Sequence, residues 1–255
     1  MIRLIERIKD FVSNVFGIGP ELSFDGWECT YSDDFSEIDE NTWSPCEKGK
    51  PNWCRFMCGN IPTVHSESGE TFVRLECDND FKNNTFVTNG ITTKGKRVFS
   101  PGRIEVTARF KPGKTTWPAI WMVNNGNTSI DEYYEIDMCE YLDDRDSVNV
   151  TFHCPSSMNK KSRPIYRTSR NFNKDGWNTF VCEWDEDHIM VFVNGKRALT
   201  VVNEENQTRF PVNIKDRFFF LILSMQYSRS GSLKPDISEL PLWMDVKTVR
   251  HWRKS

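Results

Sequence analysis

Several features that would assign the chain to a common class are missing from its 255 residues. No apolar stretch reaches the roughly 18–20 residues that a membrane-spanning helix requires. No basic run occurs, and 33 Lys and Arg are outnumbered by 36 Asp and Glu, which argues against nucleic acid as a partner. Internal repeats and linker-like segments are also missing. We therefore expect a single domain over residues 21–255, preceded by a short separate segment at residues 1–20.

The first 16 residues carry the helical periodicity of the sequence. Their apolar positions recur at helical spacing, and charged residues interrupt them too often for a signal peptide, which would also need a cleavage site of small residues. This pattern predicts a short N-terminal amphipathic helix. Two roles stay open: the helix docks on the body of the protein, or it anchors the chain to a membrane surface or a partner protein.

Eight cysteines are present, and five of them fall between positions 29 and 77. Disulfides would be expected if the chain is secreted, whereas free cysteines are common in protein cores. Cys54, Cys58 and His65 could also bind zinc, but the spacing is irregular and no second C-x-x-C follows. We favour disulfides or buried thiols over a metal site.

Period-2 alternation dominates the chain after residue 20. Apolar and polar residues alternate at 73–77, 104–110 and 180–184, as expected for strands with one buried face. Asn194-Gly195 between two apolar runs predicts a hairpin with a type I′ turn. The run 218–223 predicts a strand that is covered on both faces, and 243–252 predicts a closing strand. Many strands joined by short polar turns indicate an all-β sandwich or jelly roll.

The segment 133–142, YYEIDMCEYL, carries the chemistry. On a strand, Tyr133, Glu135 and Asp137 would share one face, and strict alternation would send Glu140 into the core. Burying that charge is costly, so we predict a one-residue bulge at Met138-Cys139 that returns Glu140 to the face of the other acids.

Three acids in one row raise one another's pKa values, so that one carboxyl group can stay protonated near neutral pH. Glycosidic cleavage needs this division of roles, because one carboxylate attacks the anomeric carbon while an acid protonates the leaving oxygen. A retaining enzyme holds the two groups about 5–5.5 Å apart. Taken alone, the E-x-D-x-x-E pattern is equally compatible with a solvated acidic strand or a cation site.

The segments around these acids add a family resemblance. Four segments lie around EIDMCE: SPGRIEV at 100–106, TWPAIWM at 116–122, GWNTFVCEW at 176–184 and VNG at 193–195. Together with EIDMCE, their order and spacing resemble glycoside hydrolase family 16. The resemblance extends from about Asp34 to Trp252. The resemblance implies a bent β-sandwich jelly roll of the concanavalin A-like kind. It also implies Glu135 as nucleophile, Asp137 as the assisting acid and Glu140 as general acid/base. The two-residue spacing before Glu140 resembles the laminarinase-like branch.

The same resemblance suggests further site residues, several of them with an alternative reading. Trp117 would line the cleft or pack in the core, and Trp121 more readily packs in the core. Arg103 would reach the cleft or pair with a surface acid, and His153 would lie near the cleft or be structural. Gln226 and Tyr133 are further candidate sugar contacts. Asp245 resembles an aspartate that ligates a structural calcium ion, whereas catalysis itself is expected to need no cofactor.

The expected function is an endo-acting retaining hydrolase of a β-linked polysaccharide, such as β-1,3-glucan, a related β-glucan or a marine galactan. The loop 129–134 departs from the laminarinase pattern, which has a Trp-Pro pair and a glycine before the nucleophile, so the substrate stays open. The alternatives are a catalytically idle lectin-like module and a transglycosylase that uses the same residues. We expect a monomer that acts outside the cell or at its surface, although no clear signal peptide is present.

Overall fold

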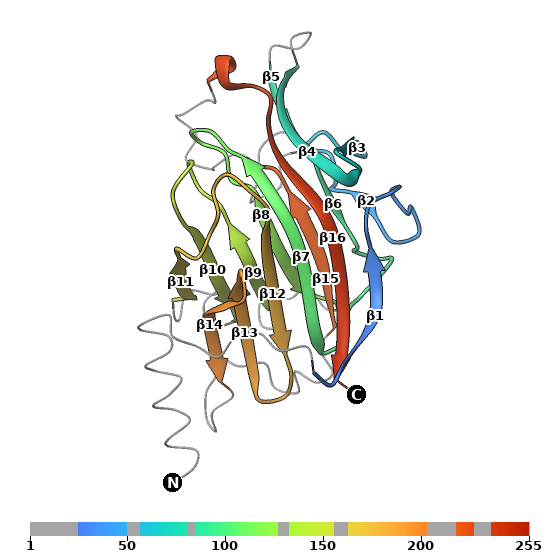
Figure 1. Ribbon diagram of the computed structural model, residues 1–255, viewed down its shortest axis with the longest axis vertical. Helices are drawn as coiled ribbons and strands as arrows, with labels where there is room; N and C mark the ends of the chain where they lie inside the picture. The colour runs from blue at the N-terminus through green and yellow to red at the C-terminus, as the bar shows by residue number, and fades with distance from the viewer. Residues whose placement is uncertain are drawn as a thin grey trace.

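The computed structural model describes residues 25–49, 57–80, 85–126, 133–155, 163–202, 218–226 and 236–254. Their strands form two antiparallel sheets that pack face to face (Figure 1). The predicted N-terminal helix and Cys54 lie outside these residues. No helix in the described part of the chain is long and apolar enough to cross a membrane.

One sheet has nine strands. The central path follows the order β14 (Lys196–Val202), β13 (His188–Val193), β12 (Asn178–Trp184), β7 (Gly102–Lys111), β16 (Leu242–Lys254), β4 (Glu70–Asp80) and β3 (Thr63–Glu67). Two further strands pair with its members: β1 (Trp27–Asp33) with β16, and β5 (Thr85–Thr88) with β4. The strand predicted at 243–252 is therefore β16, which lies inside this sheet and not at its end.

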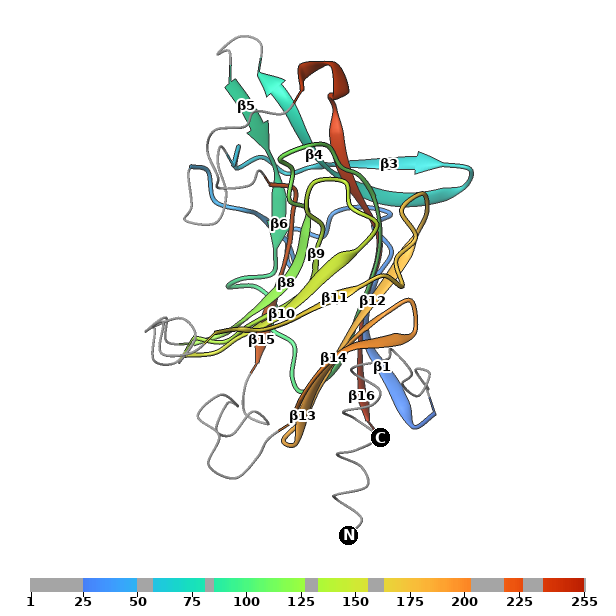
Figure 2. The ribbon, with the colours of Figure 1, turned by 90° about the vertical axis from the view of Figure 1, so that its left-hand side faces the viewer.

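The other sheet has seven strands. Its order is β11 (Ile165–Ser169), β10 (Val148–His153), β9 (Glu135–Glu140), β8 (Ala119–Asn124), β15 (Phe219–Ser224), β6 (Gly90–Thr92) and β2 (Ser44–Pro45). Figure 2 shows the two sheets from the side, with β8, β9, β10 and β11 in one layer and β12 and β16 in the other. A 3-10 turn, η3 (Ile237–Glu239), precedes β16.

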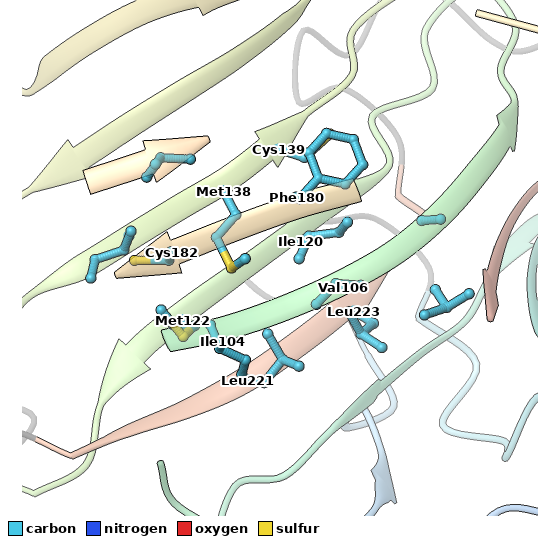
Figure 3. Packing of buried hydrophobic residues seen from close by; sticks show 14 of the residues in the cluster. Ile104, Val106, Ile120, Met122, Met138, Cys139, Phe180, Cys182, Leu221 and Leu223 are labelled. Carbon is cyan, nitrogen blue, oxygen red and sulfur yellow. The ribbon is translucent and has the colours of Figure 1, made fainter. Parts of the chain in front are cut away.

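The core lies between the two sheets and follows the alternation read from the sequence. Ile104 and Val106 of β7 and Phe180 of β12 are fully or almost fully buried and face residues of β8, β9 and β15 (Figure 3). Every residue of β15 is buried, as predicted for a strand covered on both faces. Core residues such as Ile104 alternate with polar residues of the outer face, so the sequence pattern of each strand indicates which side chains face the core.

Two local predictions are confirmed. Asn194 and Gly195 have φ values of 49° and 77°, and the positive φ at both positions is that of a type I′ turn between β13 and β14. The cysteines of the described residues are free thiols, and five of them are buried: Cys46, Cys77, Cys139, Cys154 and Cys182. Within these residues the reading of buried thiols therefore holds, and no disulfide forms.

Candidate active site

A bulge in β9 brings the three acids onto one face. Asp137 is paired with Thr151 of β10, whereas Glu140 is paired with Asn149, so β9 spans three residues where β10 spans two. The ladder between β8 and β9 shifts at the same place. Met138 and Cys139 both enter the core. The predicted bulge is confirmed, and Glu140 points to the outer face of the seven-stranded sheet, beside Glu135 and Asp137.

The neighbouring strand β10 supplies polar partners to all three acids. His153 Nε2 lies 3.6 Å from Glu135 Oε1 and 3.3 Å from Asp137 Oδ2. The second of these contacts is poorly aligned, and Asp137 Oδ2 makes no hydrogen bond within the described residues. Thr151 Oγ1 donates to Glu140 Oε2 at 2.8 Å. Thr151 was not identified from the sequence, although it lies two positions before His153 and therefore on the same face.

Tyr133 holds Glu135 from the other side. Its hydroxyl donates a hydrogen bond to Glu135 Oε2. Burial, together with the nearby Glu135 charge, raises the pKa of the Tyr133 phenol, so it keeps its proton and stays a donor. The sequence suggested Tyr133 as a sugar contact. Its observed contact is with the carboxylate, and a positioning role follows from it.

Burial dominates the electrostatics of the acids. It raises the pKa of Glu135 to about 8, with a further contribution from Asp137, while His153 and the Tyr133 hydroxyl act in the opposite direction. Burial and the charge of Glu140 raise the pKa of Asp137, and burial raises that of Glu140. The cluster therefore holds protons near neutral pH, as an acid/base pair requires.

Trp117 lies next to Glu140, and its backbone pairs with that of Gln226. The backbone N–H of Trp117 donates to the Gln226 carbonyl at 2.6 Å. The Trp117 indole N–H makes no well-aligned hydrogen bond within the described residues, yet it is near enough to lower the pKa of Glu140. The side-chain oxygen of Gln226 is likewise buried without a described partner. The Trp117 indole thus lies beside Glu140, as expected for a sugar contact, whereas the contact of Gln226 is made by its backbone.

Trp121 lies on the acid face but is nearly covered. It is paired with Asp137 across β8 and β9, and its indole N–H donates to Ser224 Oγ at 3.2 Å. Only 6% of the side chain is exposed. It belongs to a second apolar cluster on this face, with Cys46, Met57, Ala119, Val123, Phe220 and Ile222. Trp121 therefore supports the floor of the face and offers little surface to a sugar.

The prediction that Arg103 reaches the acids is wrong. Arg103 lies on β7 of the other sheet and is 2% exposed. Its Nε and Nη2 donate to Glu183 Oε1 at 2.9 and 2.6 Å, and its guanidinium lies 4.3 Å from the centre of the Trp27 ring. Because Ile104 faces the core, the preceding Arg103 must face away from it, on the surface opposite the acids.

The contacts of Asp245 do not fit a calcium ligand. Arg74 donates to both of its carboxylate oxygens, at 2.7 and 2.9 Å, and Arg109 Nε donates to Oδ2 at 3.0 Å. Asp245 is fully buried on the outer side of β16. A dication beside two guanidinium groups would be repelled, and the carboxylate is already paired. An ion-pair cluster thus occupies the position for which the resemblance implied calcium.

Truncation of this carboxylate is expected to destabilise the fold. In Asp245→Ala, Arg74 and Arg109 lose their shared counter-charge, and the free energy of unfolding should fall by about 3–5 kcal/mol. Urea unfolding measures this, and the exposed Asp187→Ala variant should stay within about 0.5 kcal/mol of the wild type. If the wild type lost comparable stability on addition of EDTA, a bound calcium ion would replace this account.

The fold and the clustered acids are those of a glycosidase, and comparison with known proteins gives the family. The sequence profile described as glycosyl hydrolases family 16 matches residues 59–224. The chain therefore belongs to glycosyl hydrolase family 16.

Curated relatives and a solved structure agree with this assignment. The chain is 26% identical to a keratan-sulfate endo-1,4-beta-galactosidase of Sphingobacterium multivorum over 89% of its length. It is 29% identical to the glucan endo-1,3-beta-glucosidase A1 of Niallia circulans over 64% of its length. It spans 55% and 26% of these two relatives, respectively. The laminarinase of Rhodothermus marinus shares the fold, with a TM-score of 0.76 at 23% identity, covering 90% of this chain and 98% of that one.

Proposed function

We propose that the chain is an endo-acting, retaining β-glycosidase that cleaves a β-linked polysaccharide. Glu135 is the nucleophile, Glu140 the general acid/base, and Asp137 a positioning residue. The observation that carries this proposal is the bulge of β9, with the three acids on one face and His153, Thr151 and Tyr133 around them.

The first step breaks the glycosidic bond. The ionised carboxylate of Glu135 forms a bond to the anomeric carbon while the bond to the leaving oxygen breaks, and Glu140 transfers its proton to that oxygen. In the second step Glu140 takes a proton from water, the resulting hydroxide attacks the anomeric carbon, and Glu135 leaves. Two inversions give net retention.

Asp137 and Tyr133 decide which acid is ionised. The raised pKa of Asp137 keeps a proton on this carboxyl group, which spares Glu135 a second negative charge beside it. The hydroxyl of Tyr133 stabilises the Glu135 carboxylate by a charge-assisted hydrogen bond. Burial raises the pKa of Glu135 to about 8 even with the Tyr133 and His153 contacts in place, and these contacts increase the fraction of Glu135 in the ionised, nucleophilic form.

For the substrate we propose a β-galactosidic bond in a keratan-type chain, with β-1,3-glucan as the second candidate. The similarity to the keratan-sulfate galactosidase extends over more of the chain than the similarity to the glucanase. The second candidate is supported by that glucanase relative. The sequence of residues 129–134 lacks the laminarinase pattern, and this favours the keratan-type chain over β-1,3-glucan.

Release of reducing ends tests the activity and the substrate together. Keratan sulfate, its desulfated form, laminarin, mixed-linkage glucan, agarose, porphyran and carrageenan are incubated with the wild type and with Glu135→Gln. We expect one class to be cut by the wild type alone. Binding without cleavage by the wild type would favour the lectin-like alternative, and products longer than the starting oligosaccharide would indicate transglycosylation.

Tyr133→Phe should move the acid limb of the pH profile. Without the hydroxyl the Glu135 carboxylate loses a donor, its pKa rises, and less of it is ionised at a given acidic pH. The acid limb of kcat/KM should therefore shift to higher pH, with about tenfold lower kcat/KM on that limb. The matched Tyr166→Phe variant, at an exposed tyrosine, should leave the profile in place. An unshifted limb in Tyr133→Phe would remove the positioning role.

A further inference from the structure

The outer face of the nine-stranded sheet carries a second cluster of aromatic and charged side chains. Arg74 of β4 and Arg109 of β7 are both direct cross-strand neighbours of Asp245 on β16. The guanidinium of Arg74 lies 4.4 Å from the centre of the Trp243 ring, and that of Arg109 lies 4.7 Å from the centre of the Trp177 ring. Buried Asp245 fixes both guanidinium groups, so the face is rigid.

This cluster surrounds a hollow of about 330 Å³. It is lined by Phe72, Arg74, Arg109, Trp243 and the edge-strand residues His65, Ser66 and Glu67. Phe72 is 2% exposed, and the ring of His65 stacks on it at 5.8 Å. The hollow faces away from the core on the sheet opposite the acids, so it is separate from the proposed active site. Its size and mixed lining suit one or two sugar rings, whose C–H faces pack on aromatic rings.

The polar groups of the hollow favour an uncharged ligand. Arg74 uses Nε and Nη2 on Asp245, and Arg109 uses Nε on Asp245 and Nη2 on Glu67. Within the described contacts, the Nη1 group of each arginine donates to no protein atom and is left for a ligand oxygen. The two positive charges are matched by Asp245 and Glu67, so the hollow has no excess charge to attract a sulfate. Hydroxyl oxygens are the acceptors that fit.

We propose that this hollow is a second, non-catalytic carbohydrate site that binds uncharged pyranose units of the same polysaccharide that the acids cleave. The identity of the ligand rests on the proposed function. Trp243 supplies apolar surface, and the Nη1 groups of Arg74 and Arg109 donate to ring hydroxyls. Binding on the face opposite the acids would hold the enzyme on a long or insoluble polymer between cleavage events.

The test counts binding sites in the inactive Glu135→Gln protein. Isothermal titration with tetrasaccharides of desulfated keratan and of laminarin should give two sites per chain for the bound sugar. Adding Trp243→Ala should leave one site, or weaken the second about three- to tenfold if the ring contributes only its packing. Adding Thr63→Glu should have the same effect, because Thr63 is the direct cross-strand neighbour of Arg74 and the new carboxylate would occupy the outward arginine donors. The matched Trp252→Ala variant, on the same face of β16 but outside the hollow, should keep two sites.

The arms of the experiment separate this proposal from the proposed function. Trp117→Ala, beside Glu140, should abolish the site at the acids and leave the hollow, whether or not the wild type cuts the polymer. If the wild type cleaves no polymer but its binding is still weakened by Trp243→Ala and Thr63→Glu, only the proposed function is contradicted. One site per chain that neither variant changes, or no binding at all, would overturn the second site. Thermal melting of each variant confirms that the fold is kept.

Discussion

Glu135→Gln is expected to lower kcat by about 10⁴-fold or more, because the amide cannot form the covalent intermediate. Glu135 lies on the outer face of β9, within reach of His153 and hydrogen-bonded to Tyr133. The substitution preserves size and removes only the negative charge. Initial rates on the substrate identified by reducing-end release measure the loss, and the exposed Glu186→Gln variant should keep wild-type activity.

The fold of this variant should be intact and should gain stability at alkaline pH. Burial raises the pKa of Glu135 from 4.5 to about 8, so the folded protein binds this proton more tightly than the unfolded chain does. The stability that this group contributes is complete below pH 4.5 and is lost as the pH rises through about 8. The glutamine side chain does not ionise, so the Glu135→Gln variant loses no stability as the pH rises. Its melting temperature should exceed that of the wild type at pH 9 and approach it at pH 5.

Azide identifies the nucleophile independently of the size of the rate loss. In Glu135→Ala the space left by the carboxylate admits azide, which attacks an activated β-glycoside once and should give the α-glycosyl azide. If azide instead restores the rate of this variant with a β-glycosyl azide as product, Glu135 is the acid/base and the two roles are exchanged.

Glu140→Gln should lower kcat by about 10²–10⁴-fold on the natural polysaccharide, the contribution of general acid catalysis. The loss should depend on the leaving group. A dinitrophenyl glycoside departs without protonation, so its first step should be nearly normal and the covalent intermediate should accumulate. A burst of dinitrophenol followed by a slow phase would show this. Equal losses on both substrates would mean that Glu140 serves another role, such as holding Glu135 in place.

Much of this site could be predicted from local sequence. A charged Glu140 cannot enter a close-packed core, while Met138 and Cys139 can, and this difference alone predicts the bulge that the structure contains. The Asn194-Gly195 turn is similarly local, because its two positive φ values suit few other residue pairs.

The predictions for Arg103 and Asp245 depended on contacts between distant segments. Arg103 was assigned from resemblance, but its strand belongs to the opposite sheet, and its partner Glu183 is on β12. Asp245 could be taken as a calcium ligand until Arg74 and Arg109, far away in sequence, were seen to share its carboxylate. The bond from Tyr133 to Glu135 is local, yet spacing places only the residue on the same face and does not indicate where its hydroxyl points. Strand order and side-chain direction, which the sequence pattern leaves open, decide all three cases.

The central claim is that Glu135 and Glu140 cleave a β-linkage by two successive displacements. Proton NMR of the anomeric signals during the first minutes of hydrolysis tests it most directly, before the new reducing ends mutarotate. The account predicts that the β-anomer appears first and the α-anomer grows only later. Initial formation of the α-anomer would mean a single inverting displacement, and Glu135 would then be a general base that activates water.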